Sequence, residues 1–219
     1  MIEKEDDLVS RLGKLNSSIV HDALRTEGLL NQTLPPEIRP IHSNQKLFGR
    51  IWTLQGKIES KIDVHDSLLS WTNFLSEAKS NSVIICQPNN DIIALMGELS
   101  AETLFKKKVR GYIVDGGSRD IARIKEIGFP VFCKFYSPKD IAGRWKVTEL
   151  GAKIKINDIE INTGDYVIAD EDGIVIIPKN DAEKIILKAE QDFNTENKMR
   201  KAILSGEDPQ KAYLKYGKF

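Results

Sequence analysis

The sequence is poor in the residues that build disulfide frameworks and zinc sites. It contains two cysteines, Cys86 and Cys133, which lie in separate apolar segments without a CxxC spacing. Its three histidines, His21, His42 and His65, lack the spacing of metal ligands as well. A disulfide framework or a zinc site is therefore not indicated, and we predict that both thiols are small core residues.

The chain also lacks an excess of charge of either sign and a long apolar run. Lysine plus arginine number 32, as do aspartate plus glutamate, so no overall basic field favours a nucleic acid or an anionic membrane. No segment approaches the roughly 18 apolar residues of a membrane span, and the acidic N-terminus does not resemble a secretory signal. We expect a cytoplasmic protein with no nucleic-acid or membrane partner.

The remaining composition is that of an ordinary globular chain, with 219 residues of which 41% are hydrophobic and 29% charged. No repeat, low-complexity tract or linker divides it. We expect a single domain over residues 1–219, with N-terminal helices in residues 1–30 and C-terminal helices in residues 180–219 packing on its core.

Strands and helices alternate in the middle of the chain. Residues 91–96, 111–115 and 129–135 are typical of strands, and residues 97–109 and 118–128 between them are typical of helices. Strands joined by helices of this length run parallel with right-handed crossovers. The sequence therefore predicts an α/β fold with a central βαβαβ unit.

Antiparallel strands are expected on both sides of this unit. Residues 82–87 and 91–96 are separated by the turn-forming "PNN" and predict a hairpin. Downstream, residues 153–161 alternate strictly between apolar and polar, and residues 165–178 give a strand, an acidic turn and a second strand.

Charged residues follow two of the predicted parallel strands. Strand 91–96 runs into Gly97 and Glu98, and strand 111–115 runs into the segment "GGSRD" that ends at Arg119 and Asp120. Because the carboxyl ends of parallel strands lie at one edge of a sheet, we expect Glu98, Arg119 and Asp120 to share a crevice.

These residue types suit a keto acid and a hard cation. Gly97 exposes the amides of Glu98, Leu99 and Ser100 at a helix start, where a carboxylate binds well. Arg119 can grip a planar carboxylate through two parallel hydrogen bonds. Two acids beside an anion site call for a cation, and oxygen ligands favour Mg²⁺ or Mn²⁺.

Each of these residues also has a purely structural explanation. Asp120 fits the first turn of a helix capped by Ser118, where the helix dipole favours an acid, and Glu98 can be explained in the same way. Arg119 can be a surface arginine, and the glycines at 116–117 can serve a turn that requires positive φ. The two acids at neighbouring strand ends leave the structural explanation and a metal site both open.

The segment "GELSAETLFKKKVRGYIVDGGSRDIARIKEIGFPVF" resembles the signature of the RraA-like superfamily. That superfamily includes metal-dependent 4-hydroxy-4-methyl-2-oxoglutarate / 4-carboxy-4-hydroxy-2-oxoadipate aldolases. Its pattern of an acid, twenty spacers and Arg-Asp matches Glu98, Arg119 and Asp120. The resemblance continues in "SSIVHDAL", "FGRIWTLQG", "INTGDYVIADEDGIVIIP" and "KAYLKYG".

The resemblance implies a swivelling α/β/β domain, assembled as a homotrimer or homohexamer with active sites at subunit boundaries. It implies that Asp120 coordinates Mg²⁺ or Mn²⁺, that Glu98 holds a water of the metal, and that Arg119 and the backbone of Gly97, Glu98 and Leu99 bind a 2-keto acid. The implied activity is pyruvate release from an acid of the 4-hydroxy-4-methyl-2-oxoglutarate type. Oxaloacetate decarboxylation is an expected companion, since it forms the same enolate.

One departure and two alternatives accompany this expectation. Arg123 stands where the aldolases commonly carry an acid, so metal affinity or substrate choice is expected to differ. The superfamily also includes regulators that bind ribonuclease E without catalysis, and those can lack the metal-binding aspartate. Retention of Asp120 favours an enzyme. A protein-binding regulator is the second hypothesis, and a carbohydrate- or keto-acid-binding protein without turnover is the third.

Overall fold

The computed structural model describes residues 6–218 and has the α/β class expected from the sequence. Its centre is a curled, mixed sheet of eight strands in the order β1-β7-β5-β3-β2-β12-β13, with β9 paired to β2. Two small sheets, β10-β11 and β4-β6-β8, lie beside it. The strands are β1 (Arg39–Pro40), β2 (Leu47–Ile58), β3 (Ser82–Gln87), β4 (Ala94–Met96), β5 (Gly111–Val114), β6 (Gly117–Ser118), β7 (Val131–Cys133), β8 (Phe135–Tyr136), β9 (Trp145–Leu150), β10 (Ile154–Ile156), β11 (Ile159–Ile161), β12 (Tyr166–Ala169) and β13 (Ile174–Ile177).

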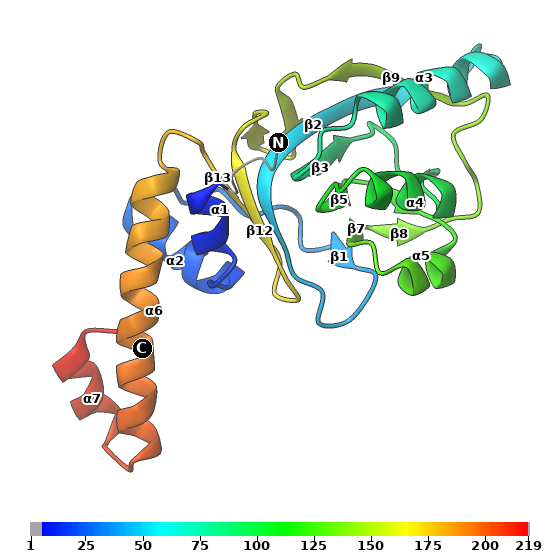
Figure 1. Ribbon diagram of the computed structural model, residues 1–219. Coiled ribbons are helices and arrows are strands. Elements are labelled where there is room, and N and C mark those ends of the chain that lie inside the picture. Colours follow the sequence, from blue (N-terminus) through cyan, green and yellow to red (C-terminus); the bar gives the residue numbers. More distant parts are fainter. Residues whose placement is uncertain (1–5, 219) are drawn as a thin grey trace.

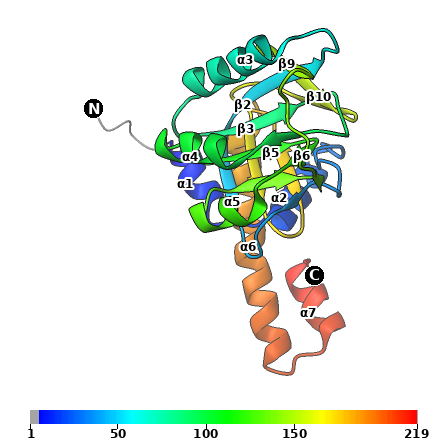
Figure 2. The same cartoon turned by 90° about the vertical axis from the view of Figure 1, so that its right-hand side faces the viewer.

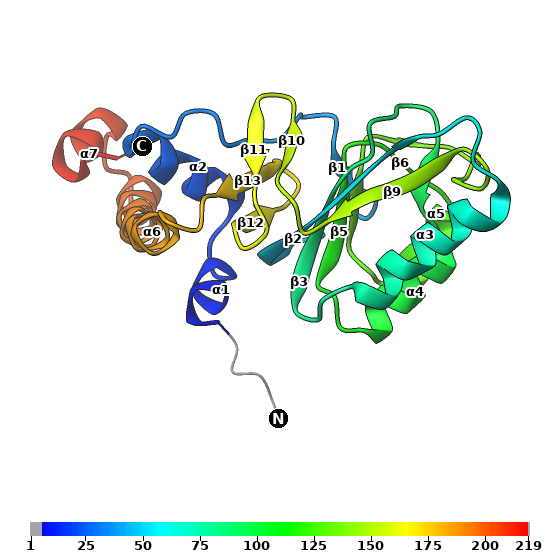
Figure 3. The ribbon, with the colours of Figure 1, turned by 90° about the horizontal axis from the view of Figure 1, so that it is seen from above.

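Helices cover the sheet from two sides (Figure 1). Strands β2, β3, β5 and β7 run parallel, and the connections between them carry α3, α4 and α5 along one face (Figure 3). No helix within residues 6–218 has both the length and the apolar character needed to cross a membrane. The helices are α1 (Asp7–Leu12), α2 (Ser17–Thr26), α3 (Val64–Glu77), α4 (Glu98–Lys106), α5 (Ile121–Ile127), α6 (Ala182–Leu204) and α7 (Pro209–Tyr216).

The central strands are buried on both faces. In β3, Ile84 and Cys86 pack toward α3 and α4, while Val83 and Ile85 pack into the inside of the curl. Such a continuous apolar run is typical of a parallel strand between two layers. Burial raises the pKa of Cys86 and of Cys133 to about 12, so both thiols stay protonated, in agreement with their expected place in the core.

The expected C-terminal packing is correct for only part of its length. The first half of α6 packs on β12 and β13 through Ile185, Ile186 and Ala189. Its second half extends away from the sheets, and α7 folds back against it (Figures 1 and 2). This arm has its own small cluster of Met199, Ala202 and Ala212, so residues 180–218 do not all pack on the core as expected, and residue 219 of that expectation lies outside the described residues.

The expected hairpin of residues 82–87 and 91–96 is wrong. β3 lies in the large sheet, whereas β4 starts the small parallel sheet β4-β6-β8. The reason lies in the connecting turn, where Asn90 Oδ1 accepts hydrogen bonds from the amides of Ile92 and Ile93 at 3.0 and 2.9 Å. This turn redirects the chain into a new sheet without reversing it.

The same change of sheet occurs three times, from β3 to β4, from β5 to β6 and from β7 to β8. The predicted βαβαβ unit is therefore divided between two sheets, because α4 connects β4 of the small sheet to β5 of the large one. The downstream antiparallel pairs, β10 with β11 and β12 with β13, are confirmed.

The close packing around Gly56 of β2 can be tested by a substitution that adds a side chain there. A Cβ at this position would lie 1.9 Å from Cζ2 of Trp145 and 2.5 Å from the carbonyl oxygen of Lys146. Trp145 has little room to move, since it is fully buried and its Nε1 donates to the Pro88 carbonyl at 2.7 Å. We expect Gly56→Ala to lower the free energy of unfolding by about 3 kcal/mol, as measured by urea denaturation.

The neighbouring substitution Lys57→Ala is the control. Lys57 is an exposed residue of the same strand, and its removal is expected to change the free energy of unfolding by about 0.5 kcal/mol or less. Equal stability of the two variants would contradict the packing at Gly56.

Candidate functional site

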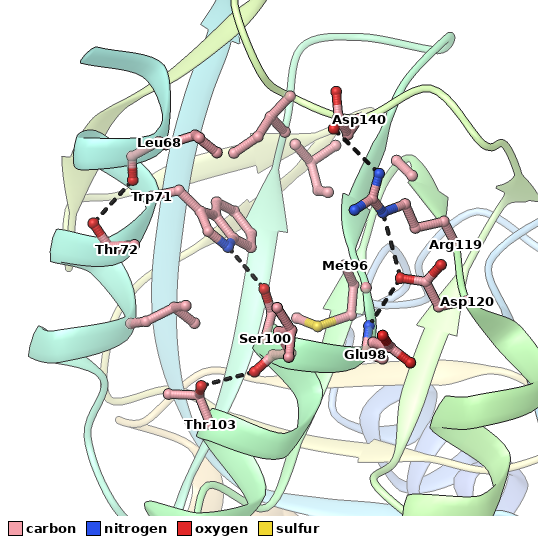
Figure 4. A pocket seen from close by; sticks show the side chains of 16 residues that line it. Leu68, Trp71, Thr72, Met96, Glu98, Ser100, Thr103, Arg119, Asp120 and Asp140 are labelled. Atoms are coloured by element: carbon pink, nitrogen blue, oxygen red, sulfur yellow. Dashed lines mark hydrogen bonds and ion pairs between the residues drawn. The ribbon is translucent and has the colours of Figure 1, made fainter. Parts of the chain in front are cut away.

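The ends of the small-sheet strands form one wall of a cavity of about 370 Å³, and helix α3 forms the opposite wall (Figure 4). Glu98 follows β4, Arg119 and Asp120 follow β6, and Asp140 lies in the segment after β8. The structure thus brings together Glu98, Arg119 and Asp120, which the sequence placed at neighbouring strand ends. The strands that carry them are β4 and β6 of the small sheet.

The carboxylate of Asp120 joins two loops. Its Oδ2 accepts a hydrogen bond from the Glu98 amide at 3.1 Å and lies 3.4 Å from Nε of Arg119. Asp120 has a left-handed backbone, with φ 55° and ψ 36°, and it occupies the N-cap position of α5 without a capping hydrogen bond from its side chain. A non-glycine residue in this conformation is strained unless the surroundings hold it there. The hydrogen bond from the Glu98 amide holds Asp120 in this conformation.

The structural explanation of Asp120 as an acid within the first helical turn is therefore wrong. Asp120 lies before the helix, and Ser118 does not cap α5, because Ser118 belongs to β6 and its Oγ donates to the Met96 carbonyl at 3.1 Å. That bond connects β6 to β4. The carboxylate of Asp120 is thus directed to the neighbouring loop and to the cavity.

Glycine is required at position 97 because two charged side chains lie close to its Cα. Its backbone is extended, with φ −139°, so any residue could adopt this conformation. A Cβ on Gly97 would, however, lie 2.7 Å from Oδ2 of Asp120 and 3.1 Å from Nε of Arg119. A side chain here would push apart the two charged groups of the site.

Gly116 and Gly117 serve packing. Neither has positive φ, so the explanation as a left-handed turn is wrong. A Cβ on Gly117 would lie 2.5 Å from Cε2 of Phe135, and one on Gly116 would lie 3.0 Å from Cγ of Pro88. Both glycines are buried, so they do not expose their backbone amides to a ligand.

Two carboxylates orient the guanidinium of Arg119. Nη1 lies 3.2 Å from Oδ2 of Asp140, and Nε faces Asp120. Asp140 is itself held by Arg144, whose Nη1 donates to its Oδ1 at 3.0 Å. Nη2 of Arg119 has no hydrogen-bond partner within residues 6–218, so it can donate to a ligand in the cavity.

Asp140 is a residue of the site that was not expected from the sequence. Residues 137–140 follow β8, and β8 is the third parallel strand of the small sheet. The rule that placed Glu98 and Asp120 at one edge applies to this strand as well. The segment 129–135 predicts a single strand, whereas the structure has two strands here, β7 and β8, and Asp140 follows the second of them.

The start of α4 offers an anion subsite beside Arg119. The first amides of a helix have no acceptor inside the helix, and the Glu98 amide is already used by Asp120. The amides of Leu99 and Ser100 follow it in the cavity lining. The side chain of Ser100 has another role, since its Oγ accepts a hydrogen bond from Nε1 of Trp71 at 2.9 Å and ties α4 to α3.

The acids of the cavity fit a cation that keeps most of its coordination for water and substrate. Oδ1 of Asp120 has no hydrogen-bond partner within the described chain, and Glu98 is exposed beside it. Residues 6–218 contain no group of three His, Cys, Asp or Glu residues placed to hold a metal. Mg²⁺ and Mn²⁺ suit one or two carboxylates, whereas a closed zinc or calcium site needs more protein ligands.

Arg123 lies outside this cavity. It is exposed on α5, where Nη1 donates to Glu126 at 2.9 Å and Nη2 donates to Glu102 at 3.2 Å. The second bond connects α5 to α4. The positive charge at this position, where the family resemblance implies an acid, therefore acts between two helices.

The sequence is similar to bacterial proteins along nearly its whole length. It is 27% identical over 212 residues to the protein DlpA of Legionella pneumophila, which covers 96% of this chain. The chain spans about a third (34%) of the length of DlpA. It is 26% identical over 217 residues to a protein of Halalkalibacterium halodurans named "Putative 4-hydroxy-4-methyl-2-oxoglutarate aldolase", with 98% of this chain and 97% of that protein covered.

The fold is shared with a solved structure of Streptomyces coelicolor RraAS2, described as an unusual member of the RNase ES inhibitor RraA protein family. The TM-score is 0.81 at 22% identity, over 90% of this chain and 98% of that one. The model of the RraA-like family, described as Aldolase/RraA, matches residues 17–176. This range contains both walls of the cavity, and the chain belongs to the RraA-like family.

Proposed function

We propose that this protein is a carbon–carbon lyase that uses a divalent cation to release pyruvate from a 4-hydroxy-2-oxo acid of the 4-hydroxy-4-methyl-2-oxoglutarate type. The observation that carries the proposal is the meeting of Asp120, Arg119 and the start of α4 in one cavity. The name of the Halalkalibacterium halodurans relative supports the same chemistry.

The chain supplies separate groups for the substrate and for the cation. Nη2 of Arg119 and the amides of Leu99 and Ser100 bind the C1 carboxylate of the keto acid. Asp120 holds the cation through the oxygen left free by Glu98 and Arg119. Mg²⁺ or Mn²⁺, when bound, supplies a Lewis acid that stabilises negative charge on the C2 oxygen.

Cleavage then proceeds as a retro-aldol reaction. The C3–C4 bond breaks and its electron pair remains on the pyruvate part as an enolate. The 4-hydroxyl group loses its proton through a water to the Glu98 carboxylate, so that C4 becomes a carbonyl carbon. Return of that proton from Glu98 through the water to C3 converts the enolate to pyruvate and restores the carboxylate. Oxaloacetate gives the same enolate when it loses CO₂, and we propose its decarboxylation as a companion activity.

Replacement of Asp120 is the direct test. We expect purified protein with Mg²⁺ to form pyruvate from 4-hydroxy-4-methyl-2-oxoglutarate or from oxaloacetate, as detected by coupling to lactate dehydrogenase. Asp120→Ala removes the cation ligand and is expected to lower kcat by about a thousandfold or more. Asp158→Ala, which removes an exposed acid of the β10–β11 turn, should leave kcat unchanged. Equal rates for the two variants would rule out the proposed role of Asp120.

Gly97 provides a second test that leaves every charged group in place. Gly97→Ala brings a methyl group against Asp120 Oδ2 and Arg119 Nε. A displacement of about 1 Å in a catalytic group can cost about a hundredfold in rate, so we expect kcat to fall by about that factor. Circular dichroism and thermal melting should show a folded protein. Wild-type kcat in a folded Gly97→Ala variant would contradict the spacing described here.

A non-catalytic regulator of a ribonuclease is the second candidate. Its support is the fold shared with RraAS2 and the name of that protein. Binding to a ribonuclease makes no use of the acids Glu98 and Asp120 or of the free Nη2 donor of Arg119 in the cavity. Tight binding to a ribonuclease E scaffold, together with absence of pyruvate from both acids, would favour the regulator over the lyase.

A further inference from the structure

The cavity has one charged wall and one apolar wall, and they face each other (Figure 4). Glu98, Arg119 and Asp120 line the charged wall. Helix α3 lines the other with Leu68, Trp71, Thr72 and Leu75. This spacing of three and four residues places all four side chains on one face of the helix.

The apolar wall is exposed at one end and firmly held at the other. Leu68 is 42% exposed, although it lines the cavity. Trp71 is 5% exposed and is fixed by its hydrogen bond to Ser100 and by contacts with the rings of Phe74 and Trp145. The wall is therefore preformed, and it presents apolar surface that a ligand can cover.

The charged wall can satisfy one carboxylate of a ligand. Within residues 6–218, Arg119 is the one cationic side chain that lines this cavity or the adjoining hollow formed by Tyr136, Ser137 and Pro138. Two of its nitrogens are already held by Asp120 and Asp140. A ligand whose C1 carboxylate takes the third nitrogen finds no second cation in the lining.

We propose that the substrate carries an uncharged, apolar group at C4. The substrate class is then a 4-hydroxy-2-oxo acid with an alkyl or aryl substituent in place of the second carboxylate of 4-hydroxy-4-methyl-2-oxoglutarate. A carboxylate placed against α3 would lose its hydration without gaining a partner. An alkyl group in the same place removes apolar surface from water on both sides. This inference rests on the proposed function and deepens it by assigning specificity to α3.

Binding of two matched keto acids tests the inference without turnover. 2-Oxoglutarate and 5-methyl-2-oxohexanoate share the chain from C1 to C4 and differ in a terminal carboxylate against an isopropyl group. We expect calorimetry on the full chain with Mg²⁺, in its own state of assembly, to show about tenfold or more tighter binding of 5-methyl-2-oxohexanoate. Equal or tighter binding of 2-oxoglutarate overturns the inference.

A pair of substitutions on α3 tests the location. Leu68→Arg places a cation on the apolar wall and is expected to shift the ratio of the two dissociation constants by about tenfold toward 2-oxoglutarate. Leu69→Arg is the matched control, because Leu69 is 57% exposed on the same helix and is absent from the cavity lining. It should keep the wild-type ratio. A wild-type ratio in Leu68→Arg overturns the assignment to α3.

Exchange of the pyruvate methyl protons separates this inference from the proposed function. Exchange with D₂O, followed by NMR, reports enolate formation and needs no group at C4. Exchange together with a preference for 2-oxoglutarate would leave the lyase standing and reject the apolar specificity. Absence of exchange and of pyruvate release from every acid would reject the lyase, and the specificity with it.

Discussion

The hydrogen bond from the Glu98 amide to the Asp120 carboxylate is the constraint on which the site depends. It joins the loop after β4 to the loop after β6, and it is made by backbone on one side and by a side chain on the other. The left-handed conformation of Asp120 directs the carboxylate toward this amide. The absence of a side chain at Gly97 leaves the space that the bond requires.

The small three-stranded sheet makes this joint possible. Each of its strands follows a strand of the large sheet along the chain. The three strands of the small sheet are parallel, so the segments that follow them lie at one edge. Ser118 bonds to the Met96 carbonyl, and Gly117 lets Phe135 approach, so the three strands are closely fitted to one another. A site built on strand ends of this kind is held more firmly than one built on loops alone.

In the proposed function, the two walls of the cavity have different roles: one carries the reacting groups and the other selects the substrate. The charged wall carries the groups proposed to bind a keto acid and a cation, whereas α3 lies opposite them and is proposed to contact the part of the substrate beyond C3. Asp140 belongs to the first wall although it contacts no proposed reacting atom, because it lies between Arg119 and Arg144 and orients the guanidinium. On this proposal, substitutions on α3 can change substrate preference and leave the groups of the charged wall in place.

The sequence by itself determined the features that depend on local pattern. Alternating apolar residues identified the β10–β11 pair, two apolar runs around an acidic turn identified the β12–β13 pair, and the alternation of strands and helices identified the α/β class. The rule for parallel strand ends was sufficient to bring Glu98, Arg119 and Asp120 together, because each follows a strand directly. These conclusions depend only on which residues are neighbours along the chain and on the right-handed crossover between parallel strands. Both can be read from the order of residues.

Tertiary structure alone decided the rest. The turn at Asn90 looked like a hairpin, and only the position of β4 shows that the strand joins another sheet. Asp120 resembled a residue of the first helical turn until its φ of 55° placed it before the helix. The apolar wall comes from α3, far from Arg119 in the sequence. No local pattern encodes which helix face lies opposite which strand end, because the packing of the whole core sets the distance between α3 and Arg119.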